Sequence, residues 1–166
     1  MKINRPLAAP LFALLLLPGC GDLLFPPPSD QELLRVFRDK QEVFNELVTR
    51  MCTGEAEKVV MMSPEWARPE IGEAEKQEFY RLFKEIGAKG AQAAPWQGEC
   101  ILRIPVWSVG LGGDGDYKGY NFGLGLHGDV TVWLESLDGV DRRSLEISFF
   151  AREIDEDWSL YFDHWP

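Results

Sequence analysis

The stretch YKGYNFGLGL, residues 117–126, decides the fold class. Large apolar side chains and glycines alternate along it, which is the period-two pattern of a β-strand with one buried face. Its apolar face carries Tyr120, Phe122, Leu124 and Leu126, and its bare face carries Gly119, Gly123 and Gly125. The stretch therefore predicts a strand of an antiparallel sheet that is covered on one side.

Similar patterns before and after it extend the prediction to a sheet of about five strands. The other expected strands are residues 100–109, 129–135, 145–154 and 158–165, and a short apolar run at 58–62 predicts one more. Pro105 cannot donate a ladder hydrogen bond, which indicates an edge strand or a bulge. We expect Val130, Val132 and Leu134 to point inward, a turn at Asp138-Gly139, and a final hairpin around Asp155-Glu156-Asp157.

Two helices are expected before this sheet, at residues 29–51 and 73–86. The first has an apolar stripe at three- and four-residue steps that includes Leu33, Phe37, Phe44, Leu47 and Met51. Ser29 and Glu32 fit a capping box at its start, and Gly54 and Gly87 follow the two helices. The prediction is an α+β fold in one domain, residues 29–166, with both helices packed on one face of the sheet.

Charge and hydropathy exclude several classes of protein. The 166 residues are 45% hydrophobic and carry a formal net charge of −10. This balance argues against nucleic-acid binding, which needs a basic patch, and against disorder along the whole chain. No apolar run approaches the roughly 18 residues that a membrane-spanning helix needs.

The first twenty residues resemble the signal peptide of bacterial lipoproteins. Lys2 and Arg5 precede an apolar stretch at residues 7–17, and Leu17-Pro18-Gly19-Cys20 is similar to a lipobox. The resemblance implies a signal peptide at residues 1–19, cleavage after Gly19, and acyl chains of the palmitate type on Cys20. Gly21, not aspartate, follows the cysteine, which favours the outer membrane by the sorting pattern of enteric bacteria.

The expected mature chain stays close to its membrane. Residues 20–28 form the lipidated cysteine and a linker that ends in Pro26-Pro27-Pro28, a semi-rigid extended spacer. The eight residues 21–28 reach only about 25–30 Å. Without Lys2 and Arg5, the chain has 15 basic residues against 27 acidic ones, a net charge of −12. We expect a periplasm-facing envelope protein that the lipid, and not its charge, holds to the membrane.

Two cysteines remain after Cys20. Cys52 ends the first expected helix and Cys100 opens the first long strand. In an oxidising compartment such a pair usually forms a disulfide, and here it would join two layers of the fold. A metal site or a reactive thiol pair is the alternative, but companion ligands at suitable spacing are missing.

Catalytic motifs are scarce, so we expect no enzyme, no cofactor and no metal. His127 and His164 are isolated from each other and from any known catalytic pattern, and His164 reads as a structural histidine. The Asp-Gly-Asp loop at residues 112–116 lacks the further ligands of a calcium loop. Asp155-Glu156-Asp157 reads as a solvated turn.

The bare glycine face is the candidate ligand face, with Trp107, Tyr117, Gly119, Gly123 and Trp133 as its residues. Aromatic side chains beside exposed backbone suit a peptide, a glycan or a partner loop. Two structural alternatives stay open: Trp107 and Trp133 pack across the gap, or a helix approaches the bare face closely.

Three classes of function fit these patterns. The first is a non-catalytic, lipid-anchored module that binds an envelope protein or polymer, including an acidic partner of a basic toxin or hydrolase. The second is a carrier with a small-ligand pocket between helices and sheet. The third is an unrecognised envelope enzyme. The lack of a catalytic pattern and the short tether favour the first.

The lipidation site gives a direct prediction. Cys20→Ser should abolish palmitate labelling and release or misprocess the chain, because the thioether is the only attachment point for the diacylglycerol. Intact-mass analysis of the membrane fraction measures this, with Cys52→Ser as the matched control that stays labelled. A wild-type protein that is soluble and retains residues before Cys20 would contradict the lipobox interpretation.

Overall fold

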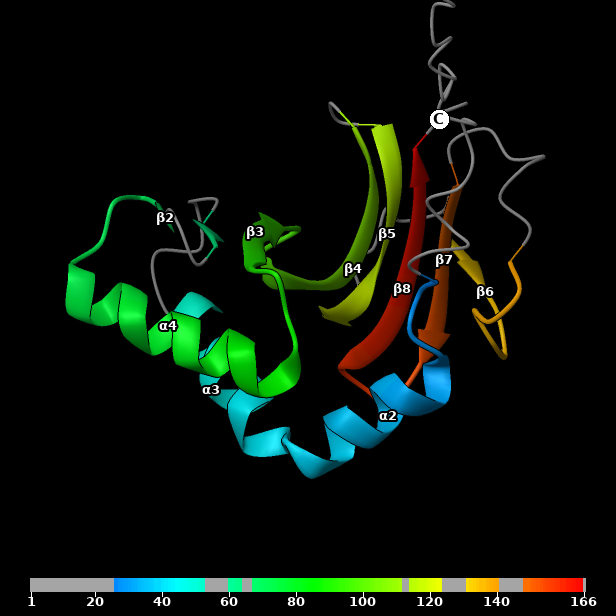
Figure 1. Cartoon of the computed structure of the whole chain (residues 1–166), viewed down its shortest axis with the longest axis horizontal. Coiled ribbons are helices and arrows are strands. Elements are labelled where there is room, and N and C mark those ends of the chain that lie inside the picture. The colour runs from blue at the N-terminus through cyan, green and yellow to red at the C-terminus, as the bar shows by residue number, and fades with distance from the viewer. Residues whose placement is uncertain are drawn as a thin grey trace, which may run out of the picture.

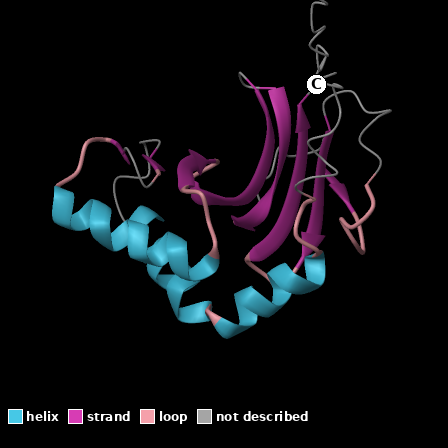
Figure 2. Cartoon of the chain, viewed as in Figure 1, coloured by secondary structure: helices cyan, strands magenta, loops and turns pink. Residues whose placement is uncertain are grey.

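A computed structural model describes residues 26–52, 60–63, 67–111, 114–123, 131–140 and 148–165. It confirms the α+β class: helices lie along one side of a curved sheet, as Figures 1 and 2 show. The described residues form three helices and a sheet of eight strands, more than the two helices and about five strands expected.

The first expected helix is divided in two. Its parts are α2 (Asp30–Asp39) and α3 (Gln41–Cys52), separated by Lys40 with φ −128° and ψ 26°. Phe37 and Phe44 stand seven residues apart, which is about 10.5 Å along a straight helix. The break lets their ring centroids approach to 5.0 Å in one aromatic cluster. The capping box of Ser29 and Glu32 is confirmed.

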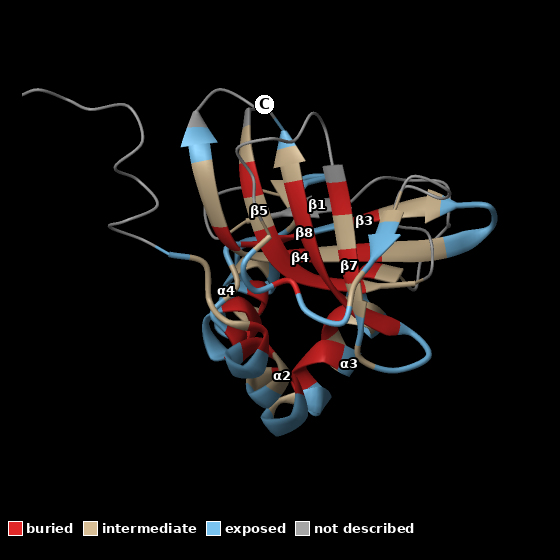
Figure 3. Ribbon diagram, turned by 90° about the vertical axis from the view of Figure 1, so that its right-hand side faces the viewer, coloured by how far each residue is buried: buried red, intermediate tan, exposed pale blue. Residues whose placement is uncertain are grey.

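The second expected helix has the predicted bounds. It is α4 (Glu73–Ile86), and it ends at Gly87, whose φ of 69° is the left-handed conformation that glycine accepts most easily. The apolar stripe of the first expected helix is buried as predicted: Leu33, Phe37, Phe44, Leu47 and Met51 are at most 6% exposed. Figure 3 shows the buried residues of the helices turned toward the sheet.

The strands run in the order β2-β1-β3-β4-β5-β8-β7-β6. Their bounds are β1 Val60–Met62, β2 Ala67–Arg68, β3 Ala91–Trp96, β4 Glu99–Leu111, β5 Asp114–Phe122, β6 Thr131–Trp133, β7 Ser148–Glu153 and β8 Trp158–Trp165. The sequence analysis missed β2, which has two residues, and β3, whose Ala-Gln-Ala-Ala start lacks the β-branched residues typical of strands. The β7–β8 hairpin is confirmed.

The edge strand β6 departs from the prediction in two ways. It pairs with β7 in parallel, with Thr131 opposite Phe149, whereas every other pair is antiparallel. The expected turn at Asp138-Gly139 is present, but Leu137 beside it is 3% exposed within the core, so this segment crosses the helix side of the sheet. Val132 stands opposite Phe150 but is 48% exposed, because β6 lies at the edge of the sheet. Leu134 is half-buried against the core, as predicted, and Val130 lies outside the described residues.

A buried ion network fixes the start of α2 on the sheet. Asp30 and Lys118 are each 1% exposed, and Lys118 Nζ lies 2.7 Å from Asp30 Oδ1. Asp30 Oδ2 also accepts from Leu137 N and pairs with Arg152 Nη1 at 2.9 Å. Burial raises the pKa of Asp30, but its hydrogen bonds with Lys118, Leu137 and Arg152 outweigh this effect and hold the pKa below its usual range.

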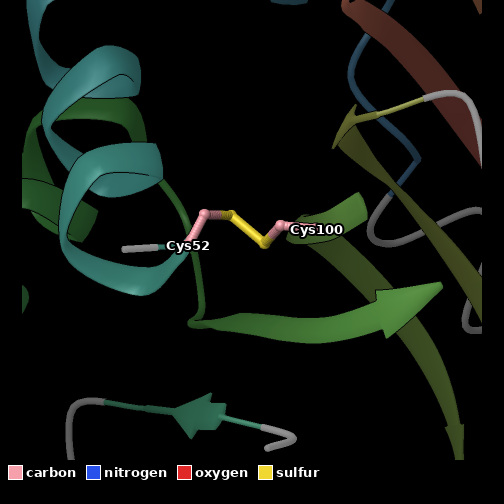
Figure 4. Close-up of a disulfide and its surroundings, with 2 residues drawn as sticks. All are labelled: Cys52 and Cys100. Atoms are coloured by element: carbon pink, nitrogen blue, oxygen red, sulfur yellow. A yellow bond between two sulfur atoms is a disulfide. The ribbon is translucent and has the colours of Figure 1, made fainter. Parts of the chain in front are cut away.

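The predicted disulfide is present. Cys52 at the end of α3 and Cys100 at the start of β4 are bonded, with Cα atoms 5.6 Å apart (Figure 4). This distance is in the usual range for disulfides. The bond ties the helix layer to the sheet across 48 residues of sequence.

Removing this bond should lower stability. Cys52→Ser should reduce the free energy of unfolding by about 2–5 kcal/mol, because the unfolded chain regains the freedom that the loop had lost. Urea unfolding of the wild type with and without reductant measures the effect. The reductant should destabilise the wild type and leave the Cys52→Ser/Cys100→Ser variant unchanged; equal stability of both proteins without reductant would contradict a formed bond.

Candidate functional site

The structure divides the five predicted ligand-face residues between the two faces of the sheet. Trp107 lies on the helix-facing side, where it is 7% exposed and its ring stacks on Phe162 with centroids 6.5 Å apart. The cause is a bulge in β4: Pro105 pairs with Gly119, and Trp107 pairs with Lys118, so Val106 is an extra residue. An extra residue reverses the alternation beyond it. Trp107 therefore belongs to the core and does not line a groove with Tyr117.

The bare glycine face is filled by the backbone of β4. A Cβ on Gly119 would lie 2.1 Å from the carbonyl oxygen of Ile104, and one on Gly123 would lie 2.7 Å from that of Cys100. These glycines allow the two strands to approach closely where the sheet curves. The atoms nearest to these two positions are backbone atoms of β4, not a tryptophan ring or a helix, which corrects both structural alternatives.

Tyr117 lies on the outer face, the side of the sheet away from the helices, within a packed cluster. It contacts Ala151 and Tyr161, which are 0% and 2% exposed. The guanidinium of Arg103 lies 4.5 Å from the centroid of the Tyr161 ring and pairs with Asp163. Burial raises the pKa of Tyr161 to about 12. This part of the outer face is closed and stabilised by its own contacts.

Trp133 and Gly123 line a hollow at one end of the outer face. Its volume is about 190 Å³, and it lies where the β7–β8 hairpin turns. The lining residues are Gly123, Trp133, Glu153, Asp155, Glu156, Asp157, Trp158 and Ser159. Trp133 is 51% exposed, the highest fraction among the large hydrophobic residues that the structure describes. Two of the five predicted residues thus meet at a hollow whose other walls the sequence analysis did not assign to a site.

The buried wall of the hollow carries an unused polar group. Ser159 is 5% exposed and lines the hollow, and its hydroxyl makes no hydrogen bond to any residue in the described ranges. Asn121 stands opposite it on β5; its Nδ2 donates to the carbonyl of Gly123 at 2.7 Å, and its Oδ1 is buried without a partner. Buried polar groups are usually hydrogen-bonded, so an open hydroxyl at a hollow favours a ligand that completes the bond.

Carboxylates surround the opening. Asp155 stabilises the turn itself, because its Oδ1 accepts from the backbone N–H groups of Asp157 and Trp158. Glu153, Glu156 and Asp157 are exposed and form no ion pair with any residue that the structure describes. The hollow therefore combines the indole ring of Trp133, exposed carboxylates and the hydroxyl of Ser159. This combination suits a positively charged or hydrogen-bond-donating group.

Sequence reasoning missed the acidic part of this site. It assigned Asp155-Glu156-Asp157 to a solvated turn, which their exposure bears out, but the turn also forms the rim of a hollow. The pairing of β6 with β7 brings Trp133 beside this turn, opposite Ala151. No local signal reports that parallel pairing, so the sequence could not have joined Trp133 to Glu153.

The groups considered for catalysis or metal binding lie elsewhere. His164 Nδ1 is 2.6 Å from Asp116 Oδ1, a cross-strand pair on the helix-facing side. Within the described ranges, no three His, Cys, Asp or Glu side chains are grouped as metal ligands, and no helix is long and apolar enough to span a membrane. The expected loop at 112–116 is shorter than predicted, because Asp114, Gly115 and Asp116 belong to β5. His127, Cys20, Gly112 and Gly113 lie outside the described residues.

Comparisons with known proteins do not extend this description. No family model, no curated protein and no solved structure matches this chain.

The close approach at Gly119 is testable. Gly119→Ala should lower the free energy of unfolding by about 3 kcal/mol, because its Cβ would overlap the backbone of Ile104. The matched control is Gly72→Ala: no atom lies within 4 Å of a Cβ there, so the loss should stay under about 1 kcal/mol. Urea denaturation compares the two variants, and a Gly119→Ala protein as stable as the control would show an open face at this position.

Proposed function

We propose that this chain is a lipid-anchored cell-envelope protein that binds a partner, without catalysis, at the outer-face hollow. The observation that carries this proposal is the combination in one hollow of Trp133, 51% exposed, with Ser159, whose hydroxyl makes no hydrogen bond to any described residue. Aromatic residues are more frequent at binding surfaces than on the rest of a protein surface, and polar groups with little exposure are usually hydrogen-bonded.

The expected anchor is compatible with such a role. The lipobox at Leu17–Cys20 and the short linker would hold the domain within about 25–30 Å of a membrane, facing the periplasm, with the outer membrane favoured. Confinement near a membrane raises the effective concentration of a module toward partners in the same layer. A protein that only needs to meet and hold a neighbour requires no catalytic group.

The alternative of a small-ligand carrier receives less support. It needs a pocket between helices and sheet. A hollow of about 390 Å³ lies between the helices and the β7–β8 turn, but most of its lining is polar, including Gln41, Asn45 and the acidic turn. Elsewhere between the two layers, aromatic rings pack. Phe44 lies 5.0 Å from Phe37, 4.6 Å from Tyr120 and 5.2 Å from Trp158, measured between ring centroids. For the enzyme alternative, the described histidine, His164, pairs with Asp116 on the helix-facing side, and neither residue lines the hollow.

Site-directed photocrosslinking in cells tests the proposal. The full chain, with a photoreactive amino acid at position 133, is irradiated in the cells that produce it, and the products are identified by mass spectrometry. Position 96 is the matched control, because Trp96 is also exposed, at 45%, but lies in the β3–β4 hairpin away from the hollow. We expect a discrete product at 133 and none at 96; no product at 133, or the same products at both positions, would contradict the proposal.

A further inference from the structure

We infer that the hollow takes the cationic end of an arginine side chain from a basic protein partner. This inference rests on the proposed function and specifies the chemistry of its partner. Four features of the hollow carry it: its charge, its aromatic wall, the hydroxyl of Ser159 and its size.

The charge of the hollow is uncompensated. Four of its eight lining residues are acidic and none is basic. The nearest basic residue in sequence, Arg152, is on the opposite face of β7, where it pairs with Asp30 at 2.9 Å. A cation in the hollow would therefore meet Glu153, Glu156 and Asp157 without competition from a described side chain.

Trp133 provides the surface on which a guanidinium binds best. Cation–π attraction is strongest over tryptophan, and a planar guanidinium also stacks on the ring. The exposed fraction of Trp133, 51%, leaves much of the indole open. Lysine would gain the charge interactions but lose the stacking.

Ser159 gives the cation a fixed partner. Its hydroxyl oxygen accepts hydrogen bonds, and an arginine side chain has five N–H donors in a rigid fork. Carboxylates at the rim and a hydroxyl in the wall allow the fork to donate in more than one direction at once. Ser159 is only 5% exposed, so its side chain has little room to move before binding.

Size and charge together favour a protein partner. The hollow holds about 190 Å³, less than the roughly 300–1,000 Å³ of typical small-molecule pockets. It therefore suits one side chain of a larger molecule. The expected net charge of −12 on the mature chain attracts basic proteins and repels anionic lipid surfaces, so a membrane headgroup is the weaker alternative.

The probe for this inference is N-acetyl-arginine methylamide, and its neutral counterpart, N-acetyl-citrulline methylamide, is the matched control. The full chain in detergent is titrated with each, and binding is followed by the backbone amide NMR signals of Gly123 and Ser159. We expect saturable shifts of these signals with arginine, at millimolar affinity, weaker at high salt. Citrulline should cause at least tenfold weaker shifts. Equal binding of the two probes would overturn the cationic assignment.

Substitutions at the hollow show which residues contribute to binding of the arginine probe. Trp133→Ala should weaken arginine binding about 3- to 30-fold, the range for cation–π contacts. Glu153→Gln should weaken it up to about fivefold, as for an exposed ion pair. Trp96→Ala and Glu99→Gln, in the β3–β4 hairpin, should leave the affinity unchanged. Equal effects at both places would show non-specific charge attraction and overturn the site.

The two proposals fail in different ways. If position 133 crosslinks a partner but arginine does not bind, the proposed function stands and the cationic chemistry is wrong. If arginine binds and the crosslink fails, the hollow recognises cations but is not the surface that the cellular partner uses.

Discussion

The buried ion pair between Asp30 and Lys118 is the interaction on which the rest of this structure depends. Neither charge is exposed by more than 1%, and burying two charges costs free energy unless each is well paired and hydrogen-bonded. Both conditions are met here. Asp30 also accepts from Leu137 N, while Lys118 has Asp138 as a second partner at 2.8 Å. Asp30 lies in the first turn of α2, where the helix dipole favours a negative charge.

The same network controls a distant part of the sheet. Ser136 and Leu137 donate to Asp30, and Asp138 accepts from the backbone of Asp30 at 2.9 Å. These three residues follow β6 directly, so their attachment to α2 holds the crossing segment on the helix side. A crossing segment is what lets β6 run parallel to β7. Trp133 therefore stands at the hollow because the chain after it is fastened to the other side of the sheet.

The regular patterns of this chain could be predicted, and the exceptions could not. Period-two and helical stripes gave the α+β class, the bounds of α4, the β7–β8 hairpin and the burial of Phe44. Cys52 and Cys100, the two cysteines that remain after Cys20, lie at the ends of expected elements and correctly predicted the disulfide. The break at Lys40 and the parallel pairing of β6 depend on long-range contacts with Asp30 and the aromatic cluster, which leave no local signal.

In the candidate site, too, some residues could be predicted from the sequence and others could not. Gly123 and Trp133 were identified because the sequence shows glycines on one face of a strand and tryptophans on other expected strands, although β6 is not a neighbour of β5. Trp107 was misplaced, since the position of the bulge after Pro105 decides its face and a proline allows either an edge or a bulge. Ser159 carries no sequence signal: its role comes from the residues that surround it. The helix-facing side of the sheet is thus packed and stabilises the fold. The exposed aromatic ring of Trp133 and the hydroxyl of Ser159 lie instead at the end of the outer face, near the β7–β8 turn.

A double-mutant cycle on Asp30 and Lys118 tests the central claim most directly. Urea unfolding of the full chain is compared for wild type, Asp30→Asn, Lys118→Met and the double variant. Each single change should cost about 3–5 kcal/mol, because it leaves a buried charge poorly paired, and the double variant should cost clearly less than the sum. Since the folded-state pKa of Asp30 is lowered, its contribution is full above the ordinary aspartate pKa and is lost as the pH falls through the lower folded value. Additive losses, or single variants within about 1 kcal/mol of wild type, would show that the helices are held to the sheet by apolar packing alone.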